Sequence, residues 1–201
     1  MRRLSVFLIL SIFILSFSSV YNIKIGETSF GTSVLIKVDP QTYRSISTID
    51  YGVVYTVDAT TVYDGLWFKS YVAAFTVDGT FTGILKAENS GNEINFVYET
   101  RYGSKTSYKL SGGKFVILDN NFILAHIERL LEYPIPYFQL VVPQLIFNPS
   151  KTEFATGQAS LKKNGEIFEI KFQDESIKIK YENGKIISLE YPGFVKVELK
   201  E

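Results

Sequence analysis

The most regular pattern in the chain is an alternation of apolar and polar residues over its last third. Between residues 168 and 199, four short runs place an apolar side chain at every second position and a charged or polar side chain between. A period of two puts all the apolar side chains of a strand on one face. We therefore predict an antiparallel sheet with one face in water. The runs cover residues 168–172, 177–181, 187–191 and 195–199.

The segments between these runs have turn-forming sequences. Asn-Gly pairs stand at 164–165 and 183–184, and Asn-Gly readily adopts the positive φ values of a two-residue hairpin. Residues 174–176 and the Pro-Gly pair at 192–193 supply the other bends. With one more strand before the first Asn-Gly pair, the pattern predicts a meander of about five strands.

The N-terminal half is also rich in residues that favour strands. Val, Ile, Thr, Tyr and Phe dominate a series of segments, and Asp78-Gly79 indicates a further hairpin. No repeat of fixed period is present, which argues against a solenoid or a propeller. The expected strands cover residues 32–38, 43–49, 53–62, 66–77, 80–88, 93–101, 106–110 and 114–118.

One segment departs from the β pattern. Residues 122–131 read Phe-Ile-Leu-Ala-His-Ile-Glu-Arg-Leu-Leu, after N-cap candidates at 119–121 and before Pro134, which ends the predicted helix. A helix that is apolar around most of its circumference has to be enclosed. We therefore predict a mainly β fold, a curved antiparallel sheet or half-open barrel (a meander) that encloses one short apolar helix.

Residues 133–150 contain four of the six prolines, interleaved with aromatic and aliphatic residues. Prolines at this density argue against a regular helix and against a central strand. The segment is nevertheless too apolar for a solvated linker. We expect a Pro-rich apolar flap over 133–150 that is packed as an extended edge or lies across the mouth of a cavity.

The N-terminus has the layout of a secretory signal peptide. Two arginines follow the first Met, residues 4–17 are mostly apolar, and Ser16 and Ser18 are suitable for cleavage after Ser18. An uncleaved anchor is the alternative, but the apolar stretch is short for a membrane span. We expect a signal peptide at 1–18, one β-rich domain at 19–201, no transmembrane span after cleavage, and a periplasmic or extracellular location.

Composition excludes several classes of site. The chain has no Cys, one His, and 21 acidic against 21 basic residues. Thiol chemistry, iron–sulfur clusters and multi-His metal centres are therefore excluded, and we predict no metal and no cofactor. The balanced charge gives no basic surface for nucleic acid, so no nucleic-acid partner is expected.

The single histidine, His126, lies in the expected helix, and histidine is the side chain whose ordinary pKa lies near neutrality. As a catalytic base it would need Asp119 or Glu128 to orient it and a Ser or Thr nucleophile. The chain has no G-x-S-x-G motif, and no pair of carboxylates stands out for glycoside cleavage. We predict no catalytic residue, and keep two alternative functions: an exported hydrolase that uses His126, and a structural or assembly module.

Aromatic residues are the remaining candidates for a binding site. Some lie in the expected strand 66–77 and others in the flap. They either fill the core or line an apolar pocket between sheet, helix and flap, which would suit a lipid or another hydrophobic molecule. With the helix histidine, the candidate ligand-binding residues are Trp67, Phe68, Tyr71, His126, Tyr133, Tyr137 and Phe138.

The whole layout resembles the periplasmic lipoprotein-carrier-like half-barrels, and is similar to uncharacterised families of secreted β-rich bacterial proteins. Residues 119–126, Leu130-Leu131 and the ending from 184 to 199 carry this resemblance. It rests on architecture and transfers no catalytic or ligand residue. In the carriers an unclosed barrel shelters acyl chains, so the resemblance implies a hydrophobic cavity. We expect an exported, non-catalytic envelope protein that binds a hydrophobic ligand such as lipid between sheet and helix or flap, with an envelope protein as the other candidate partner.

Overall fold

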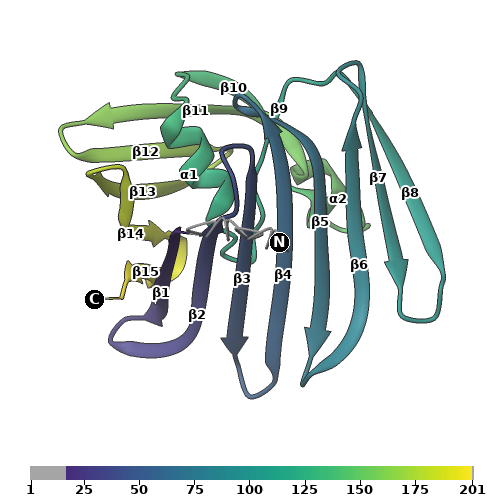
Figure 1. Cartoon of the computed structure of the whole chain (residues 1–201), viewed down its shortest axis with the longest axis horizontal. Helices are drawn as coiled ribbons and strands as arrows, with labels where there is room; N and C mark the ends of the chain where they lie inside the picture. Colours follow the sequence, from purple (N-terminus) through teal and green to yellow (C-terminus); the bar gives the residue numbers. More distant parts are fainter. Residues whose placement is uncertain (1–16, 201) are drawn as a thin grey trace, which may run out of the picture.

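The computed structural model describes residues 17–200, so most of the expected signal peptide lies outside the described residues. Strands dominate this range (Figure 1). The first eight follow one another directly: β1 (Phe17–Ile25), β2 (Thr28–Lys37), β3 (Thr42–Asp50), β4 (Val54–Asp64), β5 (Trp67–Val77), β6 (Thr80–Asn89), β7 (Glu93–Thr100) and β8 (Lys105–Ser111).

The remainder alternates strands with short helices. The strands are β9 (Phe115–Ile117), β10 (Tyr137–Val141), β11 (Thr156–Asn164), β12 (Ile167–Phe172), β13 (Glu175–Glu182), β14 (Lys185–Tyr191) and β15 (Val195–Leu199). The helices are α1 (Ala125–Glu132), α2 (Pro143–Ile146) and the single 3-10 turns η1 (Thr152–Phe154) and η2 (Pro192–Phe194).

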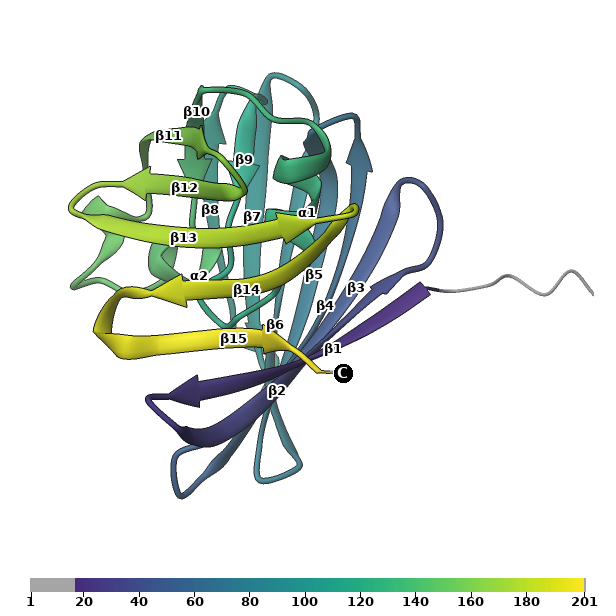
Figure 2. The ribbon, with the colours of Figure 1, turned by 90° about the vertical axis from the view of Figure 1, so that its left-hand side faces the viewer.

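All fifteen strands form one sheet in the order β8-β7-β6-β5-β4-β3-β2-β1-β15-β14-β13-β12-β11-β10-β9. Neighbours are antiparallel except β9 and β10, which are parallel. The first and last strands meet in the middle, where Ile23 lies opposite Gly31 of β2 and Val197 of β15. The sheet folds over near this junction, so β11–β15 face β3–β7 with the helices between (Figure 2). Within residues 17–200, β8 and β9 are left as outer strands and the sheet is not closed.

The predicted mainly β, half-open barrel is therefore confirmed, and the predicted strands of both halves are present. Strand β1 was not among the predicted strands, and its first two residues belong to the expected signal peptide. The Asn-Gly pair at 183–184 forms the expected hairpin turn, with φ of 51° and 76°. The other Asn-Gly pair differs, because Asn164 still belongs to β11 and the turn is formed by Gly165 and Glu166.

The concave face of β2–β5 has small side chains where α1 lies. Ser33, Ser45 and Ser47 are fully buried there, and so are Ala59 and Ala73. They are cross-strand neighbours, since Ser33 pairs with Ser47 and Ala59 pairs with both Ser45 and Ala73. Small side chains let a helix approach the backbone of the sheet closely. This patch of serines and alanines explains how the interior accommodates a helix.

The sheet also holds the start of α1. The backbone N–H of Ala125 donates to Ser45 Oγ at 3.2 Å, and Ser33 Oγ donates to the carbonyl of Phe122 at 2.8 Å. The expected N-caps at 119–121 do not cap the helix; its N-cap is Leu124, without a side-chain hydrogen bond. The helix begins three residues later than predicted because Phe122 has a φ of 58°, outside the helical region.

Enclosure of the helix is confirmed. Six of its eight residues are buried, namely Ala125, His126, Ile127, Arg129, Leu130 and Leu131. Among the described residues, no helix is long and apolar enough to cross a membrane.

The middle of the Pro-rich segment differs from the expectation of an edge or a cover, whereas Val142 and Leu145 after it line the cavity or the open hollow beside it. Tyr137–Val141 is an interior strand, β10, which pairs with β11 on one side and with β9 on the other. Pro136 and Pro143 lie just outside its ends, so the strand keeps all its backbone donors. Pro143 is the first residue of α2, where a missing N–H costs nothing.

Replacing Leu130 by Ala tests the enclosure of α1. Leu130 is completely buried, so Leu130→Ala should lower the free energy of unfolding in urea by about 2–5 kcal/mol. Ile167→Ala, at a strand end that is 37% exposed, is the control and should cost less than about 1 kcal/mol. Equal small losses in the two variants would contradict an enclosed helix.

Candidate functional site

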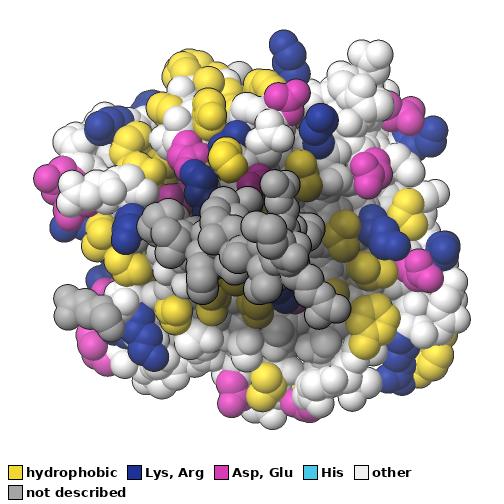
Figure 3. Space-filling view, viewed as in Figure 1, with side chains coloured by type: hydrophobic (Ala, Val, Ile, Leu, Met, Phe, Trp, Pro, Cys, Tyr) yellow, Lys and Arg dark blue, Asp and Glu magenta, His cyan; other side chains and the backbone are white. Residues whose placement is uncertain are grey.

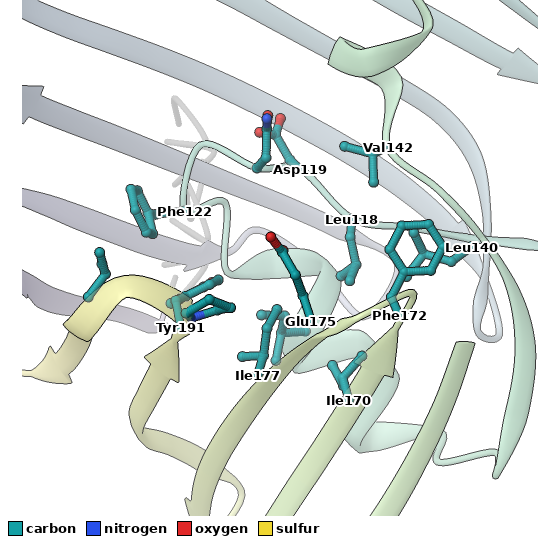
Figure 4. Close-up of a pocket in the computed structure, with 14 residues that line it drawn as sticks. Leu118, Asp119, Phe122, Leu140, Val142, Ile170, Phe172, Glu175, Ile177 and Tyr191 are labelled. Atoms are coloured by element: carbon teal, nitrogen blue, oxygen red, sulfur yellow. The ribbon is translucent and has the colours of Figure 1, made fainter. Parts of the chain in front are cut away.

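An apolar cavity of about 290 Å³ lies beside α1, between the helix and the C-terminal half of the sheet (Figure 4). Residues from the loop before α1, from α1, and from strands β10 and β12–β15 surround it. They are Leu118, Asp119, Asn120, Phe122, Ile127, Leu140, Val142, Ile170, Phe172, Glu175, Ile177, Tyr191, Pro192 and Val195.

The apolar walls follow from strand and helix periodicity. Ile170 of β12 pairs with Ile177 of β13, and the two side chains lie on the concave face. Leu140 of β10 and Ile127 of α1 add aliphatic surface from the other sides. Removing such apolar surface from water is favourable, so this lining suits an apolar ligand.

The cavity adjoins a more open hollow of about 780 Å³ at the turn between β12 and β13. Both are lined by Asn120, Val142, Phe172 and Glu175. We call the residues of this junction and of the open hollow the mouth of the cavity. The mouth is where the site changes from an aliphatic interior to polar and charged side chains.

Asp119 is a buried carboxylate in the wall near the mouth. It accepts hydrogen bonds from the Tyr71 hydroxyl, from Gln144 Nε2 at 2.5 Å, and from both the backbone N–H and the side-chain amide of Asn121. Burial raises the pKa of Asp119, while these donors oppose the shift by favouring the charged form. The network ties the loop before α1 to β5 and α2.

His126 of α1 is completely buried between the helix and strands β4 and β5. Its Nδ1 lies 2.7 Å from the hydroxyl of Tyr63, and its ring centroid lies 5.5 Å from that of Tyr71. Burial lowers the pKa of His126 to about 3, so the imidazole is neutral near neutral pH. Among the described residues, neither Asp119 nor Glu128 forms a hydrogen bond with it. This geometry adds no support to its use as a catalytic base.

A second polar cluster holds the end of α1. Glu132 accepts from Lys37 Nζ at 2.7 Å, from Arg129 Nη1 at 2.9 Å and from the Tyr43 hydroxyl at 2.7 Å. The Arg129 guanidinium also donates to the carbonyl of Gly65 at 2.6 Å. The cost of burying the charge of Arg129 is offset by these partners, so this cluster fixes the position of the helix.

The seven predicted ligand-binding residues are scattered. Tyr71 and His126 lie together, and Phe68 and Phe138 are buried in the core. Tyr133 and Tyr137 are 47% and 64% exposed, and Trp67 lines a separate hollow near Gly113. Among the residues that line the apolar cavity, none of the seven occurs.

Many of the cavity residues that were not predicted from the sequence are aliphatic. Ile127, Ile170 and Ile177 belong to elements that the apolar pattern predicts, and Leu140 belongs to the Pro-rich apolar segment. That pattern shows which side chains point inward, but a filled core and an unfilled one have the same pattern. Only the space that the tertiary structure leaves between α1, β12 and β13 separates the two cases.

Comparison with known proteins gives a structural neighbour for the fold but no match in sequence. No family model and no curated protein matches the chain. Its fold is similar to a crystal structure of a β-barrel-like protein of the domain of unknown function DUF1849 from Brucella abortus, with a TM-score of 0.51 and 14% identity over 92% of this chain and 96% of that chain. The likeness is one of fold. It supports a β-rich, barrel-like architecture, and the resemblance to lipoprotein carriers is not shown by it.

The buried histidine predicts a pH dependence of stability. Because the pKa of His126 is about 3 in the folded protein and about 6.5 unfolded, only the unfolded chain takes up the proton between these values. The free energy of unfolding should therefore fall with decreasing pH by about 1.4 kcal/mol per unit more than in His126→Gln, between about pH 6 and 4. Urea titrations of both proteins across this range measure it, and parallel profiles would contradict a buried neutral imidazole.

Proposed function

We propose that the chain is an exported, non-catalytic envelope protein that holds a hydrophobic ligand, such as the chain of a lipid, in the cavity beside α1. The observation that carries this proposal is the apolar cavity itself, about 290 Å³ in volume and walled mainly by aliphatic and aromatic side chains. Ligand sites in proteins are mostly of this kind, concave and apolar with a few polar groups.

The size of the cavity limits the ligand. Small-molecule sites commonly measure about 300–1,000 Å³, so this cavity is near the lower end of that range. It suits one slender aliphatic chain or one small apolar molecule. A bulky ligand with several chains would need the open hollow at the mouth as well.

The proposal of export rests on the two arginines and the apolar stretch at the N-terminus. A cut after Ser18 would remove the first two residues of β1, which pair with Lys37 and Ile36 of β2, and would leave its whole register with β15, from Tyr21 to Ile25. A chain without this leader would keep both neighbours of β1. The resemblance to lipoprotein carriers is part of the same proposal. In both cases an unclosed barrel would shelter a hydrophobic chain.

Titration of the delipidated protein with N-phenyl-1-naphthylamine, a neutral apolar dye, tests the proposal. We expect saturable fluorescence enhancement with one site per chain. Ile177→Trp places a larger side chain in the cavity wall and should raise the Kd at least about tenfold, a loss of about 1.4 kcal/mol.

Ile167→Trp is the matched control, since this residue lies at the other end of the β12–β13 pair and is exposed. It should bind the dye like the original protein, and thermal melting should show that both variants are folded. Dye uptake without saturation, or equal binding by both variants, would remove the proposed site.

A further inference from the structure

The charged residues at the mouth of the cavity are mostly acidic. Glu153, Asp174 and Glu175 line the mouth together with one base, Lys151, and the buried Asp119 lies in the cavity wall beside it. Further along the surface, Lys178 and Glu190 are cross-strand partners, so their charges offset one another. The mouth therefore carries a surplus of negative charge.

Three of these acidic side chains form no ion pair among the described residues, whereas Asp119 is hydrogen-bonded within the wall of the cavity. Within residues 17–200, the carboxylates of Glu153, Asp174 and Glu175 form no ion pair. On the face shown in Figure 3 acidic and basic side chains are interspersed, and some acidic residues of the protein form ion pairs, such as Asp58 with Arg44 at 2.6 Å. The free carboxylates at the mouth are available to a cation.

Glu175 is placed directly at the apolar wall. It pairs with Phe172, and it continues the inward-facing series of Ile177 and Ile179 along β13. Its side chain extends from the start of β13 toward the loop that carries Asp119 (Figure 4). A ligand chain seated between Ile170 and Ile177 would bring its polar end close to this carboxylate.

We propose that the cavity takes an amphiphile with a cationic head, an aliphatic amine in chemical class, with its chain inside and its ammonium group at the acidic mouth. This inference rests on the proposed function and adds the charge of the ligand. Opposite charges a few ångströms apart attract one another even at a protein surface, whereas a carboxylate head would be repelled. The preference weakens as salt screens the exposed charges.

Displacement of N-phenyl-1-naphthylamine by octylamine, octanol and octanoate tests this assignment, because the three compounds share one chain and differ in head charge near neutral pH. At low ionic strength octylamine should bind most tightly and octanoate least, at least about tenfold apart. Raising the salt to about 1 M should narrow this difference.

Glu175→Gln should reduce the ratio of octylamine to octanoate affinity at least about threefold, since one of the mouth charges is removed. Glu166→Gln is the control, because Glu166 lies in the turn at the opposite end of β12, and it should leave the ratio unchanged. Octanoate binding as tightly as octylamine, or an unchanged ratio in Glu175→Gln, would overturn the cationic assignment and leave the apolar site standing. Failure of the dye and of octanol to bind saturably would remove the proposed function, and this inference with it.

Discussion

Burial of one short apolar helix is the constraint on which the rest of the structure depends. The circumference of α1 cannot face water, so the sheet has to curve around it, and the serines and alanines of β2–β5 provide the space. A helix of eight residues is about 12 Å long, whereas an eight-residue strand such as β13 is about 27 Å long. The helix therefore cannot fill the interior along its whole length. The loop before α1 closes part of the remaining space, and the cavity occupies another part.

The polar groups inside this fold determine where the helix lies. Tyr63 holds His126, Tyr71 and Gln144 hold Asp119, and the Glu132 cluster holds Arg129. Each buried polar group would cost free energy without its partner, so a shift of the helix along the sheet would break several of these contacts at once. Dispersion and the hydrophobic effect enclose α1, and directional hydrogen bonds select one position for it.

Similarity to the β-barrel-like structure from Brucella abortus covers nearly the whole chain at 14% identity. An architecture shared at such low identity depends on the pattern of apolar and polar positions, which many sequences can satisfy. A fold of this kind can carry different functions, because function depends on the groups in the site. For this chain those groups are the aliphatic wall and the carboxylates at the mouth, and both lie between elements that are far apart in sequence.

The sequence by itself determined most of the strands, the turns and the presence of one enclosed helix, because periodicity and turn chemistry are local properties; β1 and β10 were not predicted. It was less successful where tertiary contacts override local rules: Ser45 replaces the expected N-cap, and β10 is an interior strand despite the flanking prolines. The predicted aromatic site residues were scattered, since Phe68 and Phe138 serve the core while Tyr137 faces solvent. Only the tertiary structure decided where space remains between α1, β12 and β13, and which charges stand at its mouth. The physical reason is that a cavity depends on packing between distant segments, while the apolar pattern records only which side chains point inward.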